Sequence, residues 1–163
     1  MIEHCTSMGL SGIDAFTVSI EADIGRGMPI FDVVGLPDAA VKESRGRVKS
    51  SMINCGFDFP LGRIIVNLAP ADIRKEGPLY DLPILITLLK ATGQLGADTL
   101  DSVFIGELSL GGEVRPVNGI LPMTIEAKEK RLQKRLYSIR KPCRSRSGKR
   151  NRRLSDKNGS RTI

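Results

Sequence analysis

A chain of 163 residues with 40% apolar and 4% aromatic side chains can form one globular domain with an aliphatic core. No apolar run reaches the roughly 18 residues that a membrane-spanning helix needs, and the N-terminus lacks the pattern of a secretory signal, so no membrane contact is expected. The net charge of +7 divides unequally: residues 1–129 carry 11 basic and 17 acidic side chains, whereas residues 130–163 carry 14 basic side chains and one acid, Asp156.

The first half of the body predicts three strands, a helix and a fourth strand. Alternation of apolar and polar residues indicates strands at His4–Leu10, Ala15–Ile24 and Ile30–Val34, and a β-rich run indicates another at Arg63–Leu68. Between them, Asp38 is placed as the N-cap of a helix that runs to about Asn54.

The charge pattern of this first helix predicts which side faces water. One stripe of the helix, expected to face the core, consists of Val41, Ser44, Val48 and Met52. Arg45, Arg47 and Lys49 are expected on the exposed side, with Glu43 and Arg47 spaced for an i,i+4 ion pair.

The second half predicts a buried helix, a hairpin and a last helix. Asp81 is expected to cap a helix that is apolar on most sides, with Pro83 in its first turn. Gly111-Gly112 predicts a two-residue hairpin between strands Val103–Leu110 and Glu113–Val117. An amphipathic helix is expected from about Ile120. The order of elements indicates an α+β fold in which helices pack on one face of a mixed sheet.

Cysteine and histidine give no sign of a metal centre. The three cysteines, Cys5, Cys55 and Cys143, are odd in number and far apart, which favours a reducing cytoplasm. His4 and Cys5 are neighbours in a strand and point to opposite faces, so they cannot chelate together. No metal ligand is assigned.

Four stretches resemble one family: Gly12–Val34, Pro37–Ser44, Phe57–Ile84 and Gly106–Met123. They are similar to the N-terminal domain of bacterial magnesium-chelatase-like AAA+ proteins of the competence-related helicase group. The resemblance covers about residues 1–130. It implies the ribosomal protein S5 domain 2-like fold, which the proteolytic domain of Lon shares.

Lon-type proteases resemble the chain around Lys75–Leu79 and Gly106–Ile120, and the comparison argues against catalysis. Those proteases carry a nucleophilic Ser directly after a Lys-Asp-Gly-Pro run, where this sequence has Leu79, and a Lys a few residues after the second glycine-rich stretch. Here no lysine follows Gly119 until Lys128. A serine also needs a neighbouring amine to become nucleophilic, so a peptidase is not expected.

Nucleotide hydrolysis is not expected either. The nearest approach to a P-loop, Ser147-Gly148-Lys149-Arg150, lacks both the first glycine and the final Ser or Thr. By the resemblance, ATP and Mg²⁺ belong only to the full-length family, and this chain has no cofactor of its own.

Arg74, Lys75, Glu76 and Asp81 form the candidate interaction loop. The simplest interpretation is a solvated loop that leads to a capped helix. The functional interpretation is a vestigial catalytic groove that now contacts another domain or subunit. Direct binding of a ligand is the third alternative.

Residues 131–163 form a basic tail without an apolar period, so disorder is expected there. Its candidate nucleic-acid-binding residues are Arg144, Arg146, Lys149, Arg150, Arg152 and Arg153. Such side chains bind phosphate without sequence preference, but Tyr137 is the tail's one aromatic residue for stacking on bases.

A second hypothesis explains the tail as the product of a shifted reading frame or a truncated gene. Permitted codons for residues 136–150, read one nucleotide later, encode a Pro-x-x-Asn run followed by an Ala/Glu-rich helix, which the family resemblance predicts at this point. The coding nucleotides would decide between the two explanations.

By resemblance, the chain is expected to be a non-catalytic docking or regulatory domain of an AAA+ ATPase. Such ATPases are hexameric and are associated with DNA handling during natural transformation. The expected partners are therefore an AAA+ module or the subunits of a family hexamer. The alternative is a nucleic-acid-binding protein that acts non-specifically through its basic tail.

Overall fold

The computed structural model describes residues 2–96, 99, 102–130 and the backbone of 135–137. Its six-stranded sheet has the order β3-β4-β2-β1-β5-β8. The strands are β1 (Ile2–Ser11), β2 (Asp14–Gly25), β3 (Ile30–Val34), β4 (Arg63–Ala69), β5 (Ser102–Phe104) and β8 (Arg135–Tyr137). The sheet is mixed, because the β1–β2 and β2–β4 pairs are antiparallel and the β3–β4, β1–β5 and β5–β8 pairs are parallel.

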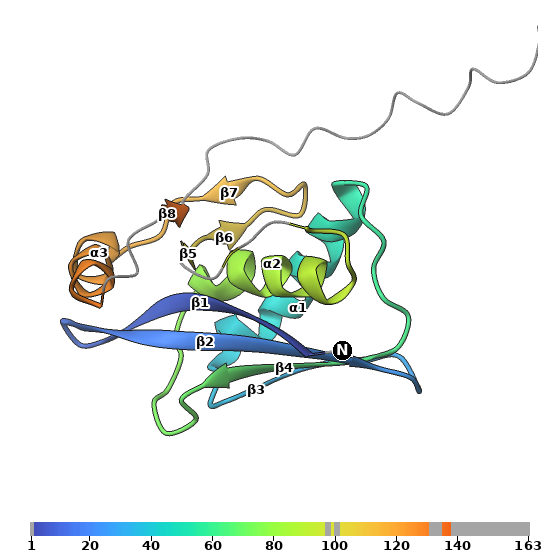
Figure 1. Ribbon diagram of the computed structural model, residues 1–163, viewed down its shortest axis with the longest axis horizontal. Helices are drawn as coiled ribbons and strands as arrows, with labels where there is room; N and C mark the ends of the chain where they lie inside the picture. Colours follow the sequence, from blue (N-terminus) through green and yellow to red (C-terminus); the bar gives the residue numbers. More distant parts are fainter. Residues whose placement is uncertain (1, 97–98, 100–101, 131–134, 138–163) are drawn as a thin grey trace, which may run out of the picture.

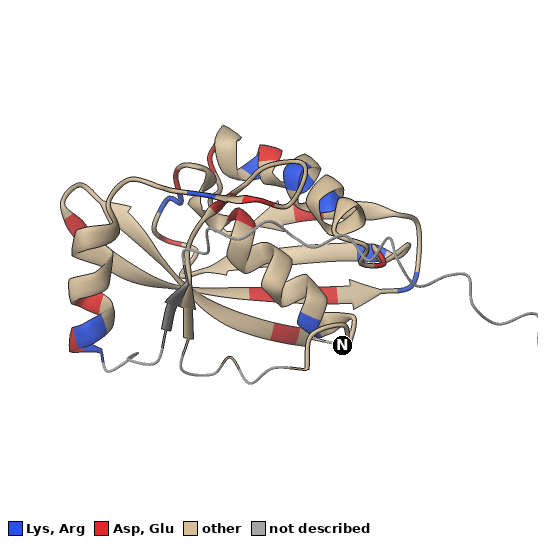
Figure 2. Ribbon diagram, turned by 90° about the horizontal axis from the view of Figure 1, so that it is seen from above, with Lys and Arg blue, Asp and Glu red and all other residues tan. Residues whose placement is uncertain are grey.

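Two helices cover the inner face of this sheet. They are α1 (Ala39–Asn54) and α2 (Asp81–Ala91), and α2 follows directly on a short 3₁₀ helix, η1 (Pro78–Tyr80). Figure 1 shows both helices above the layer formed by β1, β2, β3 and β4. Most of the Lys and Arg positions of the helices lie on α1 (Figure 2).

Alternation along the strands builds the core between these layers. Every second residue of β2 and β4 is buried, namely Val18, Ile20 and Ala22 on β2 and Ile64, Val66 and Leu68 on β4. The register pairs Ile20 with Cys5 and with Leu68, so the buried side chains of three strands meet. Helix α2 is buried along most of its length, as its apolar sequence predicts.

Helix α3 (Ile120–Glu129) lies on the other side of the sheet, at the turn between β1 and β2. Its C-cap residue Lys130 donates to Thr17, which alternates with the inward-facing Val18. A Cβ on Gly119, at its N-cap, would lie 2.2 Å from the side chain of Leu10. The predicted α+β class and mixed sheet are confirmed, and the inner face holds α1 and α2 rather than all three helices.

The predicted strand Val103–Leu110 is wrong as a single element. Strand β5 ends at Phe104, and a separate antiparallel pair forms from β6 (Glu107–Leu108) and β7 (Val114–Arg115). Gly106 causes the break, because its N–H donates to the carbonyl of Leu79 and its carbonyl accepts from the amide of Leu82. The β6–β7 connection is also longer than the predicted two residues.

Strand β8 lies within the segment that the sequence assigns to the tail, at one edge of the sheet. The other residues of 131–163 lie outside the described part, so the predicted domain boundary stays a prediction. Among the described helices, none has the length and apolar content to cross a membrane.

Candidate functional site

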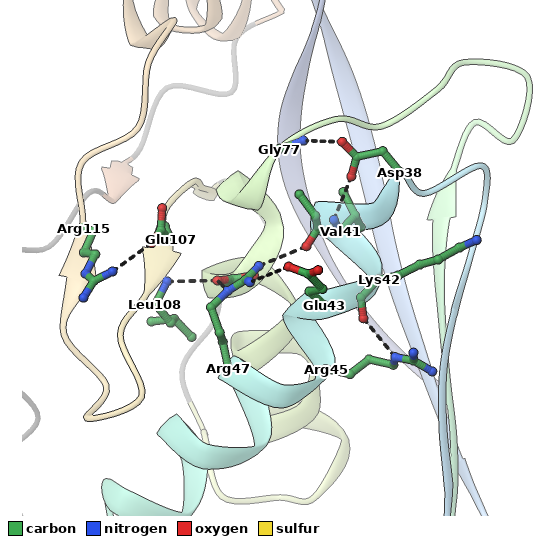
Figure 3. A network of polar contacts seen from close by, with 12 residues as sticks. Asp38, Val41, Lys42, Glu43, Arg45, Arg47, Gly77, Glu107, Leu108 and Arg115 are labelled. Carbon is green, nitrogen blue, oxygen red and sulfur yellow. Dashed lines mark hydrogen bonds and ion pairs between the residues drawn. The ribbon is translucent and has the colours of Figure 1, made fainter.

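The candidate interaction loop lies where four parts of the chain meet: the start of α1, the segment 70–77, the start of α2 and strand β6 (Figure 3). We call this meeting point the junction and define it by Asp38, Arg47, Lys75, Asp81 and Leu108. It joins residues up to 70 positions apart in the sequence.

Asp38 connects the start of α1 to the loop. Its carboxylate accepts a hydrogen bond from the amide of Val41 at 2.7 Å, which caps the helix as predicted. The second carboxylate oxygen accepts from the amide of Gly77 at 3.1 Å. One side chain therefore fixes both a helix end and the loop.

Backbone hydrogen bonds hold the same two segments together. The amide of Asp38 donates to the carbonyl of Lys75 at 3.0 Å, and the amide of Lys75 donates to the carbonyl of Leu36 at 3.1 Å. These bonds resemble a short strand pair, so the loop is anchored before it reaches α2.

An ion pair between Arg47 and Asp81 joins the two inner helices. Arg47 donates to both carboxylate oxygens, at 2.6 and 3.0 Å, in the bidentate geometry that suits a guanidinium. Asp81 is fully buried and also accepts from the amide of Leu108 in β6 at 3.1 Å. Glu43 adds the predicted i,i+4 contact to Arg47, at 4.0 Å.

These contacts correct two sequence-based predictions. Arg47 does not lie on the exposed side of α1, because it follows the buried Ser44 by three residues and so points towards α2. Asp81 does not cap α2: it is the first helical residue, and its side chain bonds to Arg47 and Leu108. The spacing from Ser44 is the signal that could have placed Arg47.

Burial and ionic contacts act in opposite directions on Asp81. Desolvation raises the pKa of Asp81 above its usual value, while the hydrogen bonds from Arg47 and Leu108 lower it. The same hydrogen bond to Asp81 raises the pKa of Arg47. The pair is a buried electrostatic contact whose two members depend on each other.

The loop residues divide into two buried and two exposed. The side chain of Lys75 is enclosed, and its ammonium donates to the carbonyls of Pro70 and Ile73. Desolvation lowers the pKa of Lys75, partly offset by Asp72. Arg74 and Glu76 keep 70% and 66% of their side chains exposed and form an ion pair at 3.4 Å.

The side chain at the position of the Lon nucleophile is a buried hydrocarbon. Leu79 lies in η1 with 8% of its surface exposed and belongs to the core. Lys130 donates to the hydroxyl of Thr17, but this contact lies on the surface, and Glu126 forms an ion pair with the same lysine at 2.9 Å. Neither arrangement provides an activated hydroxyl.

The described residues hold no group of three or more His, Cys, Asp and Glu side chains that could bind a metal. Cys5 is a buried thiol that accepts a hydrogen bond from Thr87 at 3.0 Å. Burial raises the pKa of Cys5 to about 12, so it is not a thiolate near neutral pH.

The candidate nucleic-acid-binding arginines and lysine of the tail lie outside the described residues, and their role stays a prediction.

Comparison with known proteins identifies relatives of the same region. Residues 20–140 match the family described as subunit ChlI of Mg-chelatase. The chain is 47% identical over 117 residues to the uncharacterized protein YifB of Escherichia coli, covering 71% of this chain and 23% of that protein.

Two further relatives match to a similar extent. The chain is 45% identical over 119 residues to the competence protein ComM of Haemophilus influenzae, covering 72% of this chain and 23% of the relative. It is 43% identical over 123 residues to the uncharacterized protein Rv2897c of Mycobacterium tuberculosis, covering 75% and 24%. The chain therefore spans about a quarter of the length of the curated relatives it matches, within their N-terminal region.

Proposed function

The chain belongs to the family of the ChlI subunit of Mg-chelatase, and we propose that its residues 1–130 act as a non-catalytic docking and regulatory module of a longer AAA+ protein. Within such a protein the module would contact the ATPase part or a neighbouring subunit. ATP and Mg²⁺ would bind in the ATPase part and not in this module.

The polar side chains of the junction support this proposal, because each of them forms contacts within the domain. Arg47 and Asp81 bind each other, Asp38 binds two backbone amides, and Lys75 binds two backbone carbonyls. A catalytic site needs polar groups that are free to contact a reacting molecule. The junction instead supports a rigid surface on which Arg74 and Glu76 are exposed.

Rigidity suits docking, because a preformed surface loses less conformational entropy on binding than a flexible one. The two exposed loop residues have opposite charges and would form polar contacts at the rim of an interface. This is the functional interpretation of the candidate interaction loop, with Lys75 and Asp81 as its internal supports.

A cleavable fusion tests the proposal. Residues 1–140 of this chain replace the matching N-terminal part of YifB of Escherichia coli, and a protease site is placed after residue 140. After cleavage, the two pieces should elute together from a sizing column if the module docks. The 163-residue chain alone marks the position of the free module.

Separation of the two pieces at micromolar concentration would contradict a docking role. Cleavage of an unstructured protein substrate such as casein by the 163-residue chain would contradict the absence of catalysis. Both measurements use folded protein, which circular dichroism verifies beforehand.

A further inference from the structure

Helix α3 carries apolar side chains on two opposite sides. Met123 and Ala127 are buried against the sheet. Leu121 and Ile125, one turn apart on the opposite side, are 72% and 52% exposed. A helix on the surface of a finished domain normally presents polar residues to water, so the outward pair needs another explanation.

A third exposed apolar residue lies at the same end of the molecule. Ile13, in the turn between β1 and β2, is 88% exposed. That turn and the start of α3 are neighbours, since Gly119 approaches the side chain of Leu10. Figure 1 shows α3 beside the tip of the β1–β2 hairpin, at the left end of the molecule. We call Ile13, Leu121 and Ile125 the α3 patch.

We propose that the α3 patch is the surface on which the part of the family protein that follows this module docks. The inference rests on the proposed function and assigns its two possible contacts to two surfaces: the α3 patch would face the part that follows in the same chain, and the exposed loop residues Arg74 and Glu76 would face a neighbouring subunit. The partner would present apolar side chains to the patch, and the polar residues Thr124, Glu126 and Lys128 of α3 would lie at the rim.

The position of the patch along the chain indicates that the following part of the family protein is its partner. The family match continues to residue 140, shortly after α3 ends at Glu129, and the relatives are about four times as long as the matched stretch. In those relatives the remaining chain therefore begins shortly after β8, the edge strand that follows α3 by a few residues. A short connection keeps two parts at high effective concentration, so a surface beside the connection is the first that the following part meets.

The chemistry of the patch favours an apolar partner over the basic side chains that dominate the tail. Ile13, Leu121 and Ile125 offer no charge to lysine or arginine, and their burial is favourable only against apolar surface. Exposed apolar groups that cluster and have a polar rim are typical of interaction sites.

Hydrogen exchange tests the inference on the uncleaved fusion described above and on the 163-residue chain. The amides of α3 should exchange at least about tenfold more slowly in the fusion than in the 163-residue chain. The double variant Leu121→Gln/Ile125→Gln should abolish this protection and release the two pieces after cleavage. Because both residues are exposed, the variant should keep the fold of the 163-residue chain.

Met28 and Leu61 provide a matched control. They are exposed apolar residues (78% and 85%) in the loops after β2 and before β4. The 12 residues of β2 separate that end from the hairpin tip by roughly 40 Å. The variant Met28→Gln/Leu61→Gln should retain both the protection of α3 and the association.

Three results would overturn the inference. In the first, the pieces remain associated but α3 exchanges equally fast in the two chains, so that docking occurs elsewhere. In the second, the α3 double variant keeps the protection. In the third, the protection of the α3 amides in the 163-residue chain increases with the concentration of that chain, which would assign the patch to a second copy. Separation of the unmodified pieces would contradict the proposed function itself.

Discussion

Arg47 of α1 and Asp81 of α2 contribute to the fold through the ion pair that they form between the two helices. The carboxylate is fully buried and bonds to a guanidinium on α1 and an amide on β6. A buried ion pair is weak grounds for net stability, because taking both charges out of water is costly. Removing one partner lowers the stability of the fold, since the other charge then remains buried without a counter-charge.

Replacing Arg47 with Met should lower the free energy of unfolding by about 3 kcal/mol at neutral pH. The deficit should become smaller as the pH falls from about 7 towards about 4. The reason is that the pKa of Asp81 is already raised by burial, and losing Arg47 would raise it further. The folded variant would then bind a proton more readily than the unfolded chain, so acid favours its folded state. Urea unfolding at a series of pH values measures both effects.

Arg45→Met is the matched control on the same helix. Arg45 pairs with Asp32 at 3.4 Å, and about half of each side chain is exposed. Its loss should cost less than about 1 kcal/mol. A deficit of Arg47→Met that is equally small, or that does not shrink in acid, would contradict the assigned role of Asp81.

The sequence predicts those helices and strands whose positions depend on local periodicity. Strands β1, β2, β3 and β4 and helices α1, α2 and α3 occur within a few residues of their predicted positions, because alternation and helical spacing follow from each segment alone. The break between β5 and β6 depends on contacts of Gly106 with η1 and α2. No property of the segment itself reveals such distant contacts.

The same distinction separates the predicted and unpredicted parts of the junction. Asp38 was identifiable as a cap because its partner is three residues away. Its bond to Gly77, 39 residues away, and the burial of Lys75 depend on how the loop folds back onto α1. A lysine within a charged run suggests a solvated side chain, and only the folded loop brings two carbonyls to its ammonium.

Asp38→Ala should lower the free energy of unfolding by about 2 kcal/mol, at the upper end of the range for a lost helix cap, because two elements lose an acceptor. Asp38→Ser should lose only part of that stability, since a hydroxyl can cap α1 but is too short to reach Gly77 as well. Urea midpoints of the two variants would measure the difference. A midpoint of Asp38→Ser equal to that of the unchanged chain would show that the bond to Gly77 contributes nothing measurable, whereas equal midpoints of the two variants would show the same of the cap.

At the scale of the whole molecule, one core holds the sheet, α1 and α2 together. Cys5 belongs to this core: it pairs with Ile20 across the sheet, its thiol donates to the carbonyl of Pro83, and it accepts from Thr87 on α2. Reaching this sulfur requires separating α2 from β1. Its reactivity should therefore report the opening of the entire domain.

Serine is placed at Cys55, which is disulfide-bonded, and at Cys143, so that Cys5 is the single thiol of the variant; Cys5 should then react with a thiol reagent only through global unfolding. Two effects protect the thiol at pH 8, since the sulfur is inaccessible and burial raises its pKa to about 12, against about 8.5 in an unfolded chain. For a domain with at least about 5 kcal/mol of stability, labelling should be roughly 10³-fold or more slower than in urea-unfolded chain. The logarithm of the labelling rate should rise linearly with urea, with the slope of equilibrium unfolding. A rate independent of low urea concentrations would instead reveal a local separation of α2 from β1, and the core would not open as a single unit.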